Sequence, residues 1–248
     1  MCYLPLVVCK SHYSFMKGIH SIPELVEFAV QHNLESLCLA DEEGLYGAVE
    51  FFTSCQEAGI KPLIGVELAE SSHVVIVIAK NEEGYKNLSK IITDLQVNKV
   101  KLMDALKPEN NNLLILCNDS FLLSQWKKNE NIGSVYLAPI VSDAKALQSL
   151  LIFISRWTDI LHRFPAIPIV KLNVFSKNEL ILYRLIRAIA QNRTLESFQS
   201  EEAIVFTDFS GPYLPFKPIV SSQEVAKMCS FEFDFSQYFF PHFVIPET

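Results

Sequence analysis

Short hydrophobic runs rich in β-branched residues alternate along the chain with segments whose apolar positions recur at helical spacing. The runs predict strands over residues 4–9, 36–40, 61–68, 73–80, 113–117, 134–140 and 167–174. The helical spacing predicts helices over residues 22–32, 47–58, 81–95, 120–128, 143–156 and 178–191. Repeated strand–helix units are typical of a mostly parallel sheet, and about seven of them in one run favour a closed βα barrel over an open sheet.

Local signals mark several of the predicted helix ends. Ser21, Pro23 and Glu24 form a capping box with an early proline, and Asn81 is the cap of a later helix. Gly59 is the residue expected just after a helix C-terminus. No helix separates residues 61–68 from residues 73–80, so this pair departs from the alternation. If the second strand of the pair is parallel like the others, His73 lies at the end of the barrel away from the strand C-termini.

The alternation stops near Thr194, where the chain breaks into short pieces that contain prolines. We therefore expect a barrel domain over residues 1–193 and an irregular C-terminal extension over residues 194–248 that packs on it. The extension carries a group of aromatic residues: Phe231, Phe233, Phe235, Tyr238, Phe239 and Phe240. Such a group packs against the barrel or forms a docking surface for a neighbouring domain.

Composition limits the classes of function. The net charge of −7 argues against strong direct binding of DNA by this chain alone. No apolar run approaches the roughly 20 residues that cross a bilayer, and the N-terminus lacks the features of a signal peptide, so we expect a cytoplasmic protein with no membrane contact. The six cysteines show no CxxC pair, which supports neither a zinc ribbon nor a disulfide framework.

The residues just after each strand are the candidates for chemistry, because the active sites of βα barrels lie at the C-terminal ends of the strands. These residues are Cys9, Lys10, Asp41, Glu42, Glu43, Glu67, Lys80, Cys117, Asn118, Asp119, Ile140 and Asn173. Their carboxylates can hold a hard cation such as Mg²⁺ or form ion pairs with Lys10. The histidines show no metal-binding spacing, and we expect His12 and His20 to be solvated loop residues.

Basic residues are densest from Lys171 to Arg193. Arg184 and Arg187 fall on one face of the predicted helix. A solvated face is the expectation, and a nucleic-acid patch is the alternative.

Four segments resemble the PHP (polymerase and histidinol phosphatase) domain in the version found at the N-terminus of the bacterial replicative DNA polymerase III alpha subunit. They are LVVCKSHYSFMKG at 6–18, ADEEGLYGAVEF at 40–51, AGIKPLIGVE at 58–67 and AKNEEGYKNL at 79–88. The similarity is weaker from Lys171 to Leu195, and residues 240–247 resemble the junction into the polymerase palm. The resemblance implies a distorted seven-stranded βα (TIM-like) barrel.

Active members of that family hold two or three metal ions and hydrolyse phosphoesters, so the resemblance also implies a ligand set. Its positions fall here on Val8, Lys10, Asp41, Glu42, Glu67, Asp119, Asn173 and Phe175. Only Asp41 and Glu67 keep the family residue. We therefore expect no bound metal and no catalytic residue, with Lys10 neutralising Asp41, Glu42 and Glu67 in place of the cations. If a metal is held, these three carboxylates are its expected ligands.

The parent family is a DNA-directed DNA polymerase; we expect no polymerase palm in this chain and therefore no DNA synthesis by this chain alone. The resemblance implies a non-catalytic module that is structural or binds a partner in DNA replication or repair, the partner being the polymerase core or a proofreading exonuclease subunit. One alternative is a phosphoesterase or 3′-5′ exonuclease that uses Mg, Mn or Zn at a rearranged carboxylate site. Another is a regulatory domain that binds a small molecule in the vacated pocket. The end of the chain near the palm junction favours an excised domain over a short paralogue.

Overall fold

The computed structural model describes residues 4–106, 111–127, 134–142, 146, 164–196 and 220–236. The strands are β1 (Leu6–Cys9), β2 (Ser36–Glu42), β3 (Lys61–Glu70), β4 (His73–Ala79), β5 (Leu113–Cys117), β6 (Val135–Leu137) and β7 (Ile169–Leu172). The helices are α1 (Ile22–Gln31), α2 (Ala48–Glu57), α3 (Glu82–Gln96), α4 (Leu102–Ala105), α5 (Ser120–Trp126), the 3₁₀ turn η1 (Lys177–Glu179), α8 (Leu180–Ala190) and α9 (Ser222–Met228).

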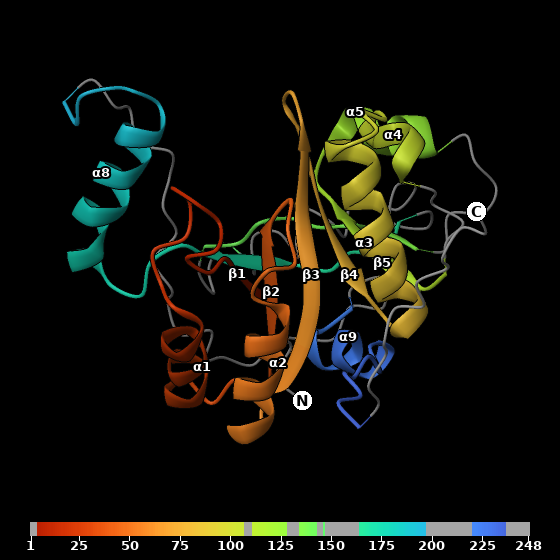
Figure 1. Cartoon of the computed structure of the whole chain (residues 1–248), viewed down its shortest axis with the longest axis horizontal. Coiled ribbons are helices and arrows are strands. Elements are labelled where there is room, and N and C mark those ends of the chain that lie inside the picture. The colour runs from red at the N-terminus through yellow and green to blue at the C-terminus, as the bar shows by residue number, and fades with distance from the viewer. Residues whose placement is uncertain are drawn as a thin grey trace, which may run out of the picture.

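The strands form one seven-stranded sheet in the order β6-β5-β4-β3-β2-β1-β7. All neighbouring pairs are parallel except β3–β4 and β4–β5, which are antiparallel. The C-terminal ends of the six parallel strands therefore meet at one end of the sheet, together with the N-terminal end of β4. Figure 1 shows this sheet with α1 and α2 beside β1 and β2, and α3 beside β4 and β5.

Hydrogen bonds join the two edges of the sheet. Leu137 at the end of β6 bridges Ala166, and Ile140 bridges Ile169 at the start of β7. The Ile169 amide donates to the Pro139 carbonyl at 2.9 Å, and the Val141 amide donates to the Ile169 carbonyl at 2.9 Å. The sheet is therefore a closed, distorted seven-stranded barrel, which confirms the expected fold.

Side chains alternate between the barrel interior and the helix layer, as strand geometry requires. Leu6 and Val8 of β1 belong to the interior cluster, whereas Val7 and Cys9 pack in the cluster that contains the buried residues of α1 and α2. A third cluster lies between β3–β5 and the helices α3 to α5. Both faces of the strands are buried, which explains why their sequences are continuous hydrophobic runs.

The predicted helix ends are confirmed at three positions. Ser21 and Glu24 form the capping box of α1, and the Asn81 side chain accepts a hydrogen bond from the Gly84 amide at the start of α3. Gly59 follows α2 with a φ of 71°, a left-handed conformation that favours glycine.

The direction of β4 corrects the placement of two residues. β3 and β4 form a hairpin in which Glu70 pairs with His73, and Ser71 in its short turn takes a φ of 57°. Because β4 is antiparallel to its neighbours, His73 lies at the same end of the barrel as the C-termini of β3 and β5. Lys80, which follows β4, lies at the opposite end.

The described part of the C-terminal extension closes the barrel at the end opposite the strand C-termini. It contains α9, a helix with its own capping box at Ser221 and Glu224 that the sequence analysis did not predict. Val225 and Cys229 belong to the interior cluster, and the Ser230 amide donates to the Lys80 carbonyl at 2.6 Å. The short helix α4 was also missed, and the helix predicted over residues 143–156 lies outside the described residues.

Aromatic stacking attaches the chain after α9 to the helix layer. The ring of Phe231 stacks on that of Tyr85 with centroids 4.7 Å apart, and Phe233 meets Phe52 edge-on at 5.2 Å. Tyr238, Phe239 and Phe240 lie outside the described residues.

None of the helices in the described residues combines the length and the hydrophobicity that a membrane crossing requires.

We predict that Phe231→Ala lowers the free energy of unfolding by about 3 kcal/mol, because it removes a ring that is 6% exposed and leaves a cavity against Phe52 and Tyr85. Urea unfolding followed by circular dichroism measures the change. The control Phe235→Ala removes a ring that is 56% exposed, and its effect should stay below about 1 kcal/mol. A loss in Phe231→Ala no larger than that in Phe235→Ala would contradict the packing role assigned to the buried ring of Phe231.

Candidate functional site at the mouth of the barrel

Three charged side chains continue the inward-facing rows of the barrel at its C-terminal end. Lys10 follows Leu6 and Val8 in the inward row of β1, and Lys171 follows the inward-facing Ile169 of β7. On β3, alternate residues face the same side of the sheet, so Glu67 points inward like Leu63 earlier in the strand. Strand alternation therefore directs these residues from three different strands toward the same space.

Glu67 is held by two lysines. Its Oε1 accepts a hydrogen bond from Lys10 Nζ at 2.6 Å, and its Oε2 accepts one from Lys171 Nζ at 2.9 Å. Burial alone would raise the pKa of Glu67, which is 8% exposed, but the two ammonium groups hold that pKa below its ordinary value. Glu67 is therefore ionised, and both of its oxygens are engaged.

Asp41 lies outside the barrel interior, because alternation along β2 places it on the face opposite Ala40. It is 1% exposed and accepts hydrogen bonds from the loop that follows β1. Its Oδ1 accepts from the Ser11 amide at 2.7 Å and from Ser14 Oγ at 2.6 Å, and its Oδ2 accepts from Ser11 Oγ at 2.8 Å. Gly18 allows this loop to close, since a Cβ there would lie 1.9 Å from the Ser11 carbonyl oxygen.

Glu42 pairs with a different residue from those that contact Glu67 and Asp41. It forms an ion pair with Lys17, and its amide donates to Ser14 Oγ at 3.0 Å. The expectation that Lys10 neutralises all three carboxylates therefore needs correction. Lys10 contacts Glu67, whereas the β1–α1 loop supplies the partners of Asp41 and Glu42.

The remaining ligand positions of the family carry no donor set for a metal. Val8 is buried in the interior, and Asn173 Nδ2 donates to the Tyr183 hydroxyl at 3.3 Å. Phe175 stacks on His20 at 3.6 Å between ring centroids. Within the described ranges, no three histidine, cysteine, aspartate or glutamate side chains are grouped so that they can hold a metal ion. These residues do not fit the metal centre of active family members.

Asp119 pairs with a residue that the sequence analysis placed at the other end of the barrel. Its Oδ2 contacts His73 Nδ1 at 2.6 Å, and its Oδ1 caps α5 by accepting from the amides of Phe121 and Leu122 at 2.8 and 3.0 Å. Burial opposes ionisation of Asp119, but the bonds from His73 and the helix amides leave its pKa below the ordinary value. The sequence did carry a signal for this pair: no helix separates β3 from β4, and strands joined by a short turn are antiparallel, which places His73 at the same end as Asp119.

Two residues expected to be solvated are buried. Arg187 is 8% exposed and donates from Nη1 to the Met16 carbonyl at 3.3 Å, whereas Arg184 on the same helix is exposed. His20 is 7% exposed, and its burial lowers its pKa. His12 is exposed, as expected.

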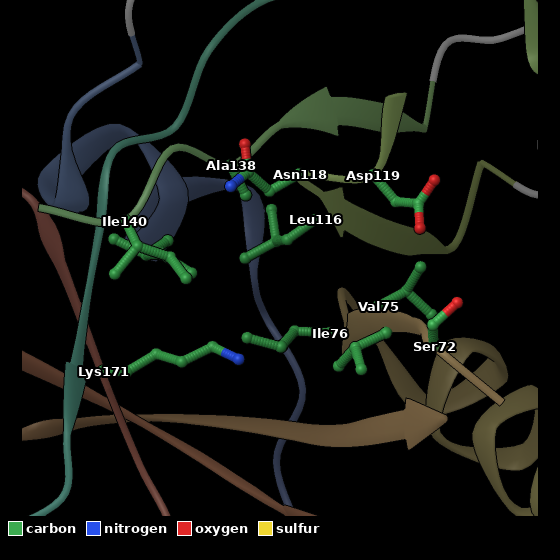
Figure 2. A pocket seen from close by; sticks show the side chains of 11 residues that line it. Ser72, Val75, Ile76, Leu116, Asn118, Asp119, Ala138, Ile140 and Lys171 are labelled. Carbon is green, nitrogen blue, oxygen red and sulfur yellow. The ribbon is translucent and has the colours of Figure 1, made fainter. Parts of the chain in front are cut away.

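Among the described residues, Lys171 and Val74 line two neighbouring cavities at this end of the barrel. One has a volume of about 200 Å³, and its lining includes Ile76, Leu116 and Asp119. Figure 2 shows the Lys171 side chain extending across this cavity toward Ile76. The other cavity has a volume of about 310 Å³ and contains the Lys10–Glu67–Lys171 bridge. The sequence analysis did not assign Lys171 or Lys17 to the site.

Comparison with known families settles the relationship. The model of the PHP domain matches residues 7–148, which is more than half of the chain. The chain belongs to the PHP family. The matched region includes Lys10, Asp41, Glu42, Glu67 and Asp119, so the altered ligand positions lie inside the recognised domain.

Curated relatives of this PHP domain are bacterial DNA polymerases. It is 39% identical over 103 residues to the DNA polymerase III subunit alpha of Chlamydia trachomatis, a match that covers 36% of this chain and 8% of the relative. It is 42% identical over 83 residues to the corresponding subunit of Mycoplasma pneumoniae, covering 32% of this chain and 9% of the relative. An error-prone DNA polymerase of Corynebacterium glutamicum is 38% identical over 87 residues, covering 35% and 8%.

Each match therefore spans less than a tenth of the relative's length. Among solved structures, an amidohydrolase from Chromobacterium violaceum aligns with a TM-score of 0.32 and 20% identity, covering 38% of this chain and 34% of the other.

We predict that Asp41→Asn lowers the free energy of unfolding by about 2 kcal/mol, because the three donors around Asp41 then meet an amide in place of a charged acceptor. Chemical denaturation of the two proteins measures the loss. Glu57→Gln, which neutralises an exposed carboxylate on α2, is the control and should change the free energy by less than about 0.5 kcal/mol. A loss no larger than that of the control would contradict the assigned role of Asp41.

The depressed pKa of Glu67 predicts a pH dependence of stability. A carboxyl group whose pKa is lower in the folded state stabilises the fold above its unfolded pKa, here near 4.5, and this contribution is lost as the pH falls through the folded pKa. The free energy of unfolding of the natural protein should therefore decrease more steeply below about pH 4.5 than that of Glu67→Gln. Parallel curves from urea titrations at several pH values would refute the assignment.

Proposed function

We propose that this PHP domain is a non-catalytic relative of the PHP domain of the DNA polymerase III alpha subunit, and that it acts as a structural or partner-binding module in DNA replication or repair. The observation that supports the proposal is the double contact on Glu67. Lysine ammonium groups lie 2.6 and 2.9 Å from its two oxygens, where a metal ion would need the carboxylate lone pairs.

The exchange of a metal for ammonium groups removes the chemistry of hydrolysis. A metal centre polarises the phosphoryl oxygen and lowers the pKa of a bound water, which then attacks. An ammonium group neutralises carboxylates and donates hydrogen bonds, but it binds no water as hydroxide. The barrel can therefore remain stable without retaining a route to phosphoester cleavage.

The partners that this proposal implies are the polymerase core or a separate proofreading exonuclease subunit. Support comes from the relatives, which are DNA polymerases many times longer than the matched region. The net charge of −7 favours a protein partner over direct contact with DNA. The five cysteines in the described regions are free and buried, which suits the reducing bacterial cytoplasm where replication proteins work.

Metal analysis and hydrolysis assays test the proposal together. Protein purified without added metal should contain well under one equivalent of zinc, manganese or magnesium, and added Mn²⁺ should give no turnover of nitrophenyl phosphate or single-stranded DNA. Asp41→Ala and Glu67→Ala are the control variants. A stoichiometric metal, with turnover that both substitutions abolish, would establish the alternative of a phosphoesterase or exonuclease with a rearranged carboxylate site.

Partner binding has its own readout. Size-exclusion chromatography with the purified polymerase core or exonuclease subunit of the same source should show a shift of this chain into a complex. Failure with both proteins would remove the partner-binding role and leave only a structural one.

A further inference from the structure

The helix α8 carries apolar side chains on the face that is turned away from the barrel. Ile181, Leu185 and Ile189 recur every four residues, and Leu182 lies beside them. We call these four residues the α8 stripe. They are between 43% and 68% exposed. A surface helix normally turns such a stripe toward the core, so α8 has the reverse orientation.

Polar groups occupy the opposite face of α8. Tyr183 and Arg187 lie four residues apart on that face and are 5% and 8% exposed. The Tyr183 hydroxyl accepts a hydrogen bond from Asn173 Nδ2 at 3.3 Å, and Arg187 Nη1 donates to the Met16 carbonyl at 3.3 Å. These contacts orient α8 without burying the stripe. Figure 1 shows α8 apart from the other labelled helices.

The exposed charges around the α8 stripe are mainly positive. Lys177, Arg184 and Arg193 are exposed, against one exposed carboxylate in the described stretch that starts at η1, that of Glu196. Lys177 precedes the helix, Arg184 lies within it and Arg193 follows its end, so basic side chains flank the stripe along its length. The chain as a whole carries a net charge of −7, so this surface reverses the overall balance.

An apolar stripe with basic flanks fits a helix whose own apolar face is flanked by acidic residues. A second copy of this chain fits poorly. In an antiparallel pair of α8 helices centred on Leu185, Lys177 of each copy would approach Arg193 of the other, and like charges repel. The stripe extends over about 12 Å of helix axis, enough for about two turns of a partner helix.

We propose that the α8 stripe is the docking surface for an acidic amphipathic helix of a partner protein. Apolar side chains of that helix cover the stripe, and its carboxylates pair with Arg184 and Arg193. The proposal rests on the partner-binding role in the proposed function, and it gives that role a surface and a partner chemistry.

Isothermal titration calorimetry of the full chain with the purified polymerase core, and with the purified exonuclease subunit of the same source, tests this surface. Ile189→Glu places a carboxylate in the stripe, facing an acidic partner, and should weaken binding by roughly tenfold or more. Glutamate forms helix at least as well as isoleucine, so α8 is retained. Val97→Glu is the matched control: Val97 is a 71% exposed apolar residue at the end of α3, and its substitution should leave binding unchanged.

Charge reversal tests the chemistry of the partner. Arg184→Glu should weaken binding by roughly tenfold, whereas Lys90→Glu, which reverses an exposed charge on α3, should leave it unchanged. Raising the salt concentration from about 50 to about 300 mM should weaken binding of the natural chain more than binding of Arg184→Glu. Binding that is lost in Ile189→Glu but unchanged in Arg184→Glu would overturn the acidic partner.

The outcomes separate this proposal from the proposed function. Binding that survives Ile189→Glu would overturn the docking surface alone, and no binding of the natural chain to either protein would overturn the partner-binding role with it. Sedimentation equilibrium of the chain alone tests the second copy: a dimer that Ile189→Glu dissociates would replace the partner helix by self-association. Urea denaturation tests whether the chain's own residues cover the stripe. A midpoint lowered by Ile189→Glu and not by Val97→Glu would show such cover and overturn the proposal.

Discussion

A buried carboxylate at the mouth of a barrel needs a positive partner, because removing an unpaired charge from water costs several kcal/mol. Glu67 finds two. Its contacts join residues 57 and 104 positions apart in the sequence, and they connect β3 to β1 and β7, so the bridge spans strands on both sides of β1 and β2. The rest of the site depends on this arrangement, since it decides which groups point into the cavity and which charges they carry.

The carboxylates of Asp41 and Glu42 do not join Glu67 in the barrel interior, because of where they lie along β2. Alternation along β2 sends Asp41 away from the interior, into a ring of three donors provided by Ser11 and Ser14. Glu42 pairs with Lys17 nearer the solvent. The three acids that were expected to share one cation, Asp41, Glu42 and Glu67, therefore have separate partners. Because each is satisfied locally, no common cation is required to hold them together.

The features that could be predicted from the sequence are those set by residues close to one another along the chain. The strands, the capping box at Ser21 and the left-handed Gly59 follow from local patterns, and the closed barrel follows from their repetition. The direction of β4 was assigned wrongly because hydrophobic runs carry no direction, and only the short turn at Ser71 reveals the hairpin. The helix α9 was missed because a few prolines around it suggested irregular structure.

The site was less predictable, because its contacts cross between distant strands. Lys10 and Glu67 were named from their positions at strand ends. Lys171 was not, since its role depends on the register between β1 and β7, which local patterns do not fix. The same holds for Arg187, whose helix places it beside the β1–α1 loop rather than in solvent.

The charge at the mouth of the barrel explains how a PHP domain can keep its architecture after its ligand set has changed. Lys10 and Lys171 together carry the charge of one divalent cation, and they apply it to Glu67, an acid that the resemblance assigns to the metal centre. The electrostatic need of the buried acid is therefore met without a metal. The two kinds of cation differ in what else they can bind: a metal needs lone pairs from its ligands, whereas ammonium groups supply donors. Under the proposed function, the exchange of metal ions for ammonium groups would therefore leave hydrogen-bond donors at the mouth of the barrel where the metal centre of active family members activates water.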